Sequence, residues 1–162
     1  MQPILLATDG SPSAEAATQE AIDLAQAFGA PLVIVSVAHL AVAPYGGYYG
    51  YPEVIADLHD GEVQRVAKVL AEVKERAFTA GLTCQTVALD GPASAEICRV
   101  ARECKPRLIV IGAHGWGRIG RLLHGSVSTD VLHEAPCPVL VVHGDEPVPA
   151  DDLAGATVGT AS

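Results

Sequence analysis

The residues best suited to chemistry lie in a glycine-rich segment, residues 112 to 128, which reads GAHGWGRIGRLLHGSVS. Because glycine has no Cβ, backbone N–H groups in such a loop can approach a charged ligand closely. A helix that begins at Gly125 and Ser126 directs its unsatisfied N–H groups and positive dipole end into the same space. The apolar run Leu108–Ile111 precedes the segment. Strand, glycine loop and helix N-terminus together predict a phosphate-binding site.

A second loop with suitable chemistry, Thr8–Ser11, follows the first apolar run. Asp9 has two explanations that the sequence leaves open. Its carboxylate can accept hydrogen bonds from an adenine amino group or a ribose hydroxyl, or help to hold a metal. Alternatively, it caps the helix that begins near Ser11.

The polar residues of the glycine segment are equally open to two explanations. Ser126 and Ser128 either donate hydroxyls to phosphate or cap the helix. His114 either contacts phosphate or ribose or plays no part in binding. Arg118 and Arg121 either attract an anion or are simply solvated, and for Arg118 we favour the second.

Five apolar runs have the length of strands, and helical patterns separate them. Strands buried on both faces, rich in Val, Ile and Leu, are typical of a parallel sheet. Alternating strands and helices predict a doubly wound α/β domain. The predicted strands are Ile4–Thr8, Leu32–Val37, Cys84–Leu89 (the weakest), Arg107–Ile111 and Pro138–Val142.

Four helices are predicted between these strands. Ser11 and Pro12 form an N-cap and first-turn proline, and Gly29 ends the first helix. Its apolar face is Ala17, Ala21, Leu24, Ala25 and Phe28. The second helix carries Val54, Ile55, Leu58, Val66, Val69, Leu70, Val73 and Ala77, and we expect Asp60–Gly61 to kink or interrupt it. The third uses Ile97, Val100, Ala101 and Cys104, and the fourth uses Val127, Val131, Leu132 and Ala135.

Composition excludes several classes of function. The 162 residues suit one domain, and 49% hydrophobic content fits a filled core. A net charge of −9 disfavours binding to nucleic acid or anionic lipid. No apolar run approaches the length of a membrane span, and the N-terminus has no signal-peptide pattern. We therefore expect a cytoplasmic protein that binds neither membrane nor nucleic acid.

Three further features have structural explanations. All four tyrosines lie in Ala41–Pro52, which we interpret as a surface connection, with a lid or partner contact as the alternative. Residues 144–162 combine acidic and small residues without apolar periodicity, so we expect a disordered tail after a domain at 1–143. Cys84, Cys98, Cys104 and Cys137 have no CxxC spacing and are interpreted as buried free thiols.

The spacing Gly112-x-x-Gly115, nine residues, then Gly125-Ser126 is similar to the ATP-binding signature of the universal stress protein (UspA-like) family. Ile4–Ser11 (ILLATDGS) resembles that family's first strand and loop. Arg121–Val142 resembles its closing helix and strand. The resemblance runs from about residue 2 to residue 143, with all elements in order, and indicates the ATP-binding subgroup.

The resemblance implies the strand order 3-2-1-4-5 and an adenine pocket at Ala7, Thr8, Asp9 and Val37. It implies that ribose and triphosphate are held by Gly112, Gly115, Gly125, Ser126, Val127 and Ser128. It further implies a homodimer through the edge strand Pro138–Val142, which would also cover an edge prone to aggregation. Ala113 departs from the family's usual serine or threonine, and the tyrosine segment has no counterpart.

These observations predict an ATP-binding stress-response regulator that acts by binding rather than fast turnover, with or without Mg²⁺. No dedicated metal cluster or general base is evident, although slow hydrolysis assisted by Asp9 and Mg²⁺ stays open. The Lys-Ser/Thr ending of a Walker loop is absent. The alternatives are a protein that binds AMP or cyclic AMP, a nucleotide-free dimerisation module, and an adenylyl- or phosphoryl-transfer enzyme. The loop Asp9-Gly10-Ser11-Pro12 has neither motif expected of such an enzyme.

Overall fold

The computed structural model describes residues 1–38, 52–113 and 126–144, and for residues 13, 52–55 and 126 it describes the backbone alone. The predictions for residues 41–51, for His114 to Gly125 and for the tail from residue 145 lie outside the described residues.

Five parallel strands form one sheet in the order β3-β2-β1-β4-β5, as the resemblance implied. Each strand agrees with its predicted range to within one residue at either end. The three central strands are buried over most of their length, because helices cover both faces of the sheet. The strands are β1 (Ile4–Ala7), β2 (Leu32–Ala38), β3 (Cys84–Asp90), β4 (Leu108–Gly112) and β5 (Val139–Val142).

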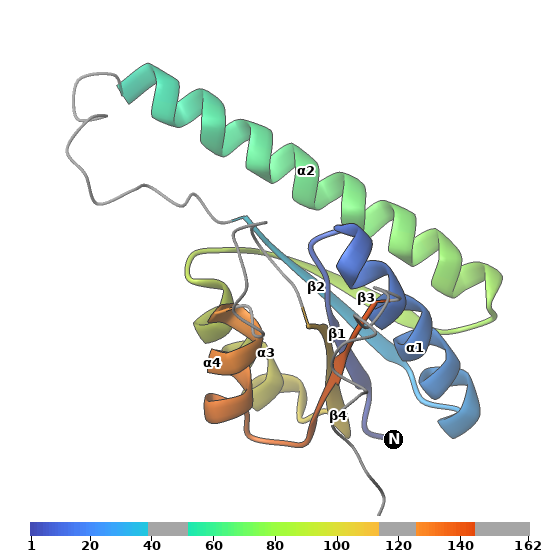
Figure 1. Cartoon of the computed structure of the whole chain (residues 1–162). Helices are drawn as coiled ribbons and strands as arrows, with labels where there is room; N and C mark the ends of the chain where they lie inside the picture. The colour runs from blue at the N-terminus through green and yellow to red at the C-terminus, as the bar shows by residue number, and fades with distance from the viewer. Residues whose placement is uncertain (39–51, 114–125, 145–162) are drawn as a thin grey trace, which may run out of the picture.

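In the described part of the chain, four helices cover the two faces of the sheet (Figure 1). The helices α1 (Pro12–Phe28) and α2 (Pro52–Thr79) pack on one face, and α3 (Ala93–Cys104) and α4 (Ser126–Glu134) pack on the other. Each face therefore has its own apolar core. Along the chain, β2 and β3 are added on one side of β1, and β4 and β5 are added on the other side. The direction of winding therefore reverses between β1 and β4.

The ends of α1 follow the predicted capping chemistry. The Ser11 side chain accepts a hydrogen bond from the Ala14 N–H at 3.3 Å, and Pro12 occupies the first helical position. Gly29 ends the helix in the left-handed conformation, with φ +61°. Both predicted ends of α1 are confirmed.

Four predictions about the helices were wrong. The helix α2 continues without interruption through Asp60–Gly61, because one glycine costs only about 1 kcal/mol within a 28-residue helix whose later turns pack on the sheet. Phe28, predicted on the buried face, is 40% exposed and lies against the Arg107 guanidinium, whose Cζ is 4.3 Å from the ring centre. Leu58 and Leu132 are also exposed. Leu58 belongs to the first half of α2, which projects beyond the sheet (Figure 1).

All four cysteines are free thiols. Cys98 is fully buried as predicted, whereas Cys84, Cys104 and Cys137 are only partly buried. Burial raises the pKa of the Cys98, Cys104 and Cys137 thiols, because it penalises the thiolate. These thiols are therefore poor nucleophiles at neutral pH.

No helix within the described ranges is long and apolar enough to cross a membrane.

Candidate functional site

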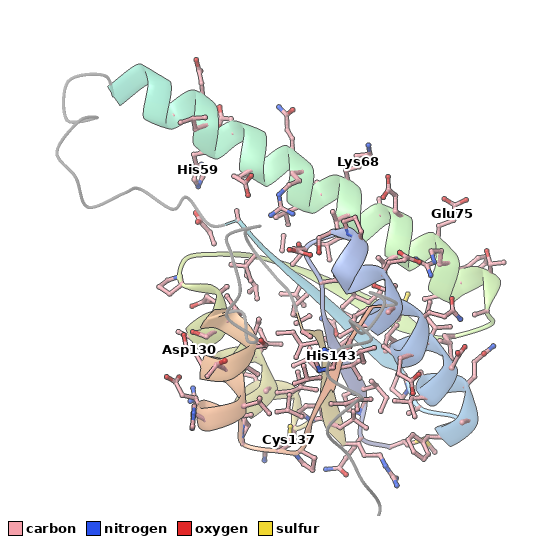
Figure 2. All side chains as sticks on the ribbon, in the orientation of Figure 1. His59, Lys68, Glu75, Asp130, Cys137 and His143 are labelled. Carbon is pink, nitrogen blue, oxygen red and sulfur yellow. The ribbon has the colours of Figure 1, made fainter. Side chains whose placement is uncertain are left out.

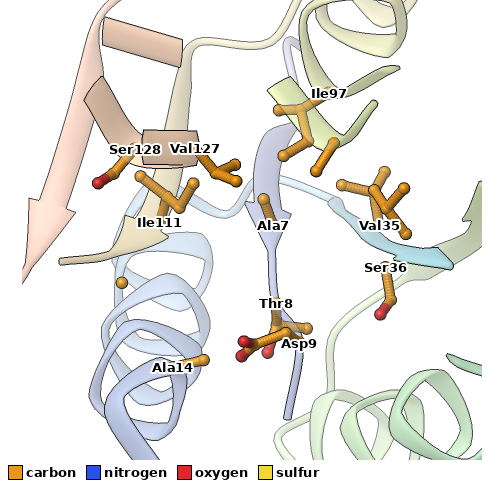
Figure 3. Close-up of a pocket in the computed structure, with 13 residues that line it drawn as sticks. Ala7, Thr8, Asp9, Ala14, Val35, Ser36, Ile97, Ile111, Val127 and Ser128 are labelled. Atoms are coloured by element: carbon orange, nitrogen blue, oxygen red, sulfur yellow. The ribbon is translucent and has the colours of Figure 1, made fainter. Parts of the chain in front are cut away.

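A pocket opens at the carboxyl ends of β1, β2 and β4, next to the point where the winding reverses (Figure 3). Ligands of doubly wound sheets bind at this position because the loops of neighbouring strands separate there. The pocket opens to solvent, and about 30 Å³ of it is space in which the centre of a water molecule fits. The lining residues are Ala7, Thr8, Asp9, Ala14, Val35, Ser36, Val37, Ala93, Ile97, Ile111, Gly112, Val127 and Ser128.

The pocket has an apolar side and a polar side. Ala7, Val35 and Ile111 belong to the core that α3 and α4 cover, and Ile97 and Val127 join them from those helices. In Figure 3 the Thr8 and Ser36 side chains point away from this group, on the opposite side of the strands. An apolar wall beside a few hydroxyl and carboxylate groups suits a planar ring with polar edges.

The β1–α1 loop is held by its own side chains. The Asp9 Oδ1 accepts a hydrogen bond from the Ser11 N–H at 2.9 Å, and the Thr8 hydroxyl accepts one from the Gly10 N–H at 3.3 Å. Of the two explanations for Asp9, the local one is thus present in the structure. Its Oδ2 makes no hydrogen bond within the described residues, so Asp9 retains an acceptor at the pocket.

Gly10 is required where this loop passes α2. Its φ is +74°, and a Cβ added there would lie 2.5 Å from Cγ2 of Val69. Val69 is itself buried. The close approach of loop and helix fixes the path of the chain directly after Thr8 and Asp9.

Arg65 of α2 joins the ends of two strands at the pocket. Its Nη1 donates to the Asp9 carbonyl at 2.8 Å, and its Nη2 donates to the Val37 carbonyl at 3.2 Å. Glu62 holds the guanidinium through Nε and Nη2, at 3.1 and 3.0 Å. A planar guanidinium can bridge two carbonyls in this way, whereas the compact ammonium of lysine cannot match the fork. Arg65 therefore fixes the spacing of two pocket residues without lining the pocket.

Ser36 stands out among the buried polar groups. Its side chain is 1% exposed, and its hydroxyl has no hydrogen-bond partner within the described residues. Buried hydroxyls are usually hydrogen-bonded, so this exception requires an explanation.

The structure brings seven of the predicted site residues together in this pocket: Ala7, Thr8, Asp9, Val37, Gly112, Val127 and Ser128. Ser126 begins α4 as predicted, and its side chain is not described. His114, Gly115, Arg121 and Gly125 lie outside the described residues. The binding roles of all twelve remain predictions.

Six pocket residues were missed by sequence reasoning: Ala14, Val35, Ser36, Ala93, Ile97 and Ile111. Val35, Ser36 and Ile111 lie near the ends of predicted strands, so strand ends were the available signal for them. Ala93 and Ile97 lie at the start of α3, and nothing in the sequence indicated that they would line the pocket. Arg65 also gave no signal, because the sequence does not show where a helix side chain will reach.

A histidine–carboxylate pair attaches α2 to the sheet beside the pocket region. His59 points from α2 toward the sheet (Figure 2), and its Nε2 lies 2.8 Å from the Asp90 Oδ2 at the end of β3. The hydrogen bond to Asp90 is the main reason that the pKa of His59 is raised above 6.5, and Asp60 adds a smaller effect of the same sign. The pair therefore stabilises the protonated imidazolium.

We expect this attachment to weaken as the pH rises. Because the pKa of His59 is raised on folding, its stabilising effect is complete below pH 6.5 and is lost as the pH passes through the raised pKa. Amide exchange around His59 in α2 should then become faster. In Asp90→Asn, an NMR titration should return the pKa of His59 toward its ordinary value. An unchanged titration would show that Asp90 does not stabilise the imidazolium.

No cluster of His, Cys, Asp and Glu in the described part of the chain has the geometry to hold a metal ion.

The comparison with known proteins agrees with this architecture. A family model described as the universal stress protein family matches residues 1–143. The chain is also 39% identical over 139 residues to a universal stress protein of Thermus aquaticus, covering 86% of this chain and 96% of that relative. The chain belongs to the universal stress protein family.

Two solved structures of universal stress proteins have the same fold. UspA from Lactobacillus plantarum has a TM-score of 0.76 and 26% identity, over 88% of this chain and 98% of its own. A universal stress protein in complex with cAMP has a TM-score of 0.65 and 27% identity, over 89% of this chain and 98% of its own. The strand order β3-β2-β1-β4-β5 is thus the universal stress protein fold.

Proposed function

We propose that this universal stress protein binds an adenine nucleotide at the pocket and acts as a binding-dependent regulator in stress responses. The observation that carries the proposal is the pocket itself. It lies where doubly wound sheets bind ligands, and it gathers seven residues that the sequence resemblance assigned to a nucleotide site. The similar universal stress protein in complex with cAMP supports the ligand class.

ATP is the nucleotide we propose, with Mg²⁺ as an accompanying ion. The sequence Gly112-x-x-Gly115, followed by Gly125-Ser126, matches the signature of the family's ATP-binding subgroup. The helix α4 begins at Ser126 next to the pocket, so its first N–H groups are suited to a phosphate. Asp9, with one acceptor oxygen already engaged by Ser11, fits ligand contact or cation attraction better than it fits a general base for fast hydrolysis.

The cyclic-AMP- or AMP-binding protein is the second candidate. The cAMP complex at 27% identity favours it.

We also propose that the protein acts in the cytoplasm as a homodimer that pairs through β5. Leu140 in that strand is 37% exposed, and a bare apolar edge strand favours pairing. Sedimentation equilibrium should give twice the monomer mass, and a monomer would contradict the dimer.

Titration with ATP, AMP and cAMP, with and without Mg²⁺, tests the nucleotide proposal. Trp116, the only tryptophan, lies in the glycine segment and serves as the fluorescent reporter, with calorimetry as the second measurement. We expect saturable binding in the micromolar range and little release of phosphate.

In Gly125→Val, binding should be lost because a side chain would occupy the phosphate path. The matched control is Gly61→Val, at an exposed position with open space around it, which should bind as the parent does. Absence of heat and fluorescence change with all three nucleotides would contradict the proposal.

A further inference from the structure

The hydroxyl of Ser36 is the one buried side-chain polar atom in the described part of the chain that lacks a hydrogen-bond partner. The other buried polar side chains are engaged. The Thr8 hydroxyl accepts from Gly10, and the Thr18 hydroxyl donates to the Ala14 carbonyl at 2.9 Å. A buried hydroxyl without a partner opposes folding, because its hydrogen bonds to water are lost and not replaced. An apolar side chain of the same size would not carry this cost.

The place of Ser36 suggests what its partner is. Ser36 lines the pocket between Val35 and Val37, near the carboxyl end of β2. The register pairs Ala7 with Val35, which puts Thr8 beside Ser36 on the neighbouring strand. Figure 3 shows both side chains on the same side of the strands. Ser36 therefore lines the polar side of the pocket, on the face of the sheet that α1 and α2 cover.

The size and chemistry of serine allow it to serve a ligand. Its hydroxyl turns between staggered rotamers about a single bond, so it can be oriented toward a ligand on the polar side of the pocket. The hydroxyl carries one donor and two acceptor sites. It can thus pair either with a ring nitrogen or with an exocyclic amino group.

We infer that Ser36 is a specificity-determining residue whose hydroxyl hydrogen-bonds the polar edge of the bound nucleobase. This inference rests on the proposed function, since it assigns a contact within the same site. The bound base supplies the hydrogen-bond partner that no described residue supplies. The contact is with the base and not with the phosphates, because Ser36 lies on β2, whereas the helix N-terminus suited to phosphate belongs to α4.

The test is Ser36→Ala, measured for binding and for stability. Calorimetric affinity should fall by up to about tenfold, which corresponds to one hydrogen bond. The fall should be equal for ATP, AMP and cAMP, because the three share the base and differ in their phosphates. Without ligand, the urea midpoint of Ser36→Ala should be unchanged or higher, because no hydrogen bond within the protein is lost.

Thr18→Val is the matched control. Thr18 is also 1% exposed, but its hydroxyl already has a partner within α1. This variant should have a lower urea midpoint and an unchanged affinity for all three nucleotides. Opposite patterns in the two variants would support a ligand role for Ser36.

Several results would overturn the inference. If the parent protein binds adenine nucleotides and Ser36→Ala binds them equally well, Ser36 makes no contact, and the proposed function still stands. A lower urea midpoint with unchanged affinity would mean that the hydroxyl has a structural partner such as bound water. A loss confined to ATP would place the contact at the phosphates. If the parent protein binds no adenine nucleotide, the proposed function fails and the inference fails with it.

Discussion

Replacing Gly10 with alanine should lower the free energy of unfolding by about 3 kcal/mol. Two effects add. A left-handed backbone at φ +74° costs an alanine about 1 kcal/mol. The new Cβ would also lie 2.5 Å from Cγ2 of the buried Val69, and relieving that overlap costs about 2 kcal/mol. Urea denaturation followed by circular dichroism measures the sum. Because the loop carries Thr8 and Asp9, nucleotide affinity should fall as well.

Gly81→Ala is the control that separates the two effects. Gly81 has nearly the same φ, +76°, but no atom lies within 4 Å of the added Cβ. Its cost should therefore be the conformational one alone, about 1 kcal/mol. Adding Val69→Ala to Gly10→Ala should recover part of the overlap cost, so the two substitutions should be non-additive. Equal destabilisation in Gly10→Ala and Gly81→Ala would show that α2 does not approach the loop as closely as described.

The second large effect is expected for Arg65→Met, which keeps the apolar stem and removes the guanidinium. The Asp9 and Val37 carbonyls each lose a donor, and the Glu62 carboxylate loses the guanidinium. Hydrogen bonds from a charged group contribute about 2 kcal/mol in such a setting, so the free energy of unfolding should fall by about that amount. Nucleotide affinity should fall several-fold, because Asp9 and Val37 line the pocket.

Arg76→Met is the matched substitution on the same helix. Arg76 of α2 also contacts another element, because it forms a salt bridge with Glu15 of α1 at 2.8 Å. The Glu15 side chain, however, is 63% exposed. Exposed pairs contribute only about 0.5 kcal/mol, because water screens them. Arg76→Met should therefore leave stability and affinity nearly unchanged. Arg65→Lys should not restore Arg65→Met, because one ammonium cannot replace the fork. Full rescue by lysine would mean that charge alone matters at this position.

The sequence by itself determined the elements of this fold. Continuous Val, Ile and Leu in β1, β2 and β4 require cover on both faces, and the structure provides it. Ser11, Pro12 and Gly29 set the ends of α1, because capping depends on hydrogen bonds within a few residues. The resemblance then supplied the strand order and seven of the thirteen pocket residues, all of them at the end of a strand or the start of α4.

Only the tertiary structure decided which groups meet across the chain. Arg65 lies 56 residues from Asp9 and 28 from Val37, and it contacts both. Gly10 is necessary because Val69 packs against it, and Ser36 is conspicuous because no described residue supplies a hydrogen-bond partner for its hydroxyl. Phe28 and Leu58 were predicted to be buried and are exposed, because periodicity gives a helix face but not the extent of the sheet beneath it. Periodicity and capping are local properties, whereas these contacts depend on how whole elements pack.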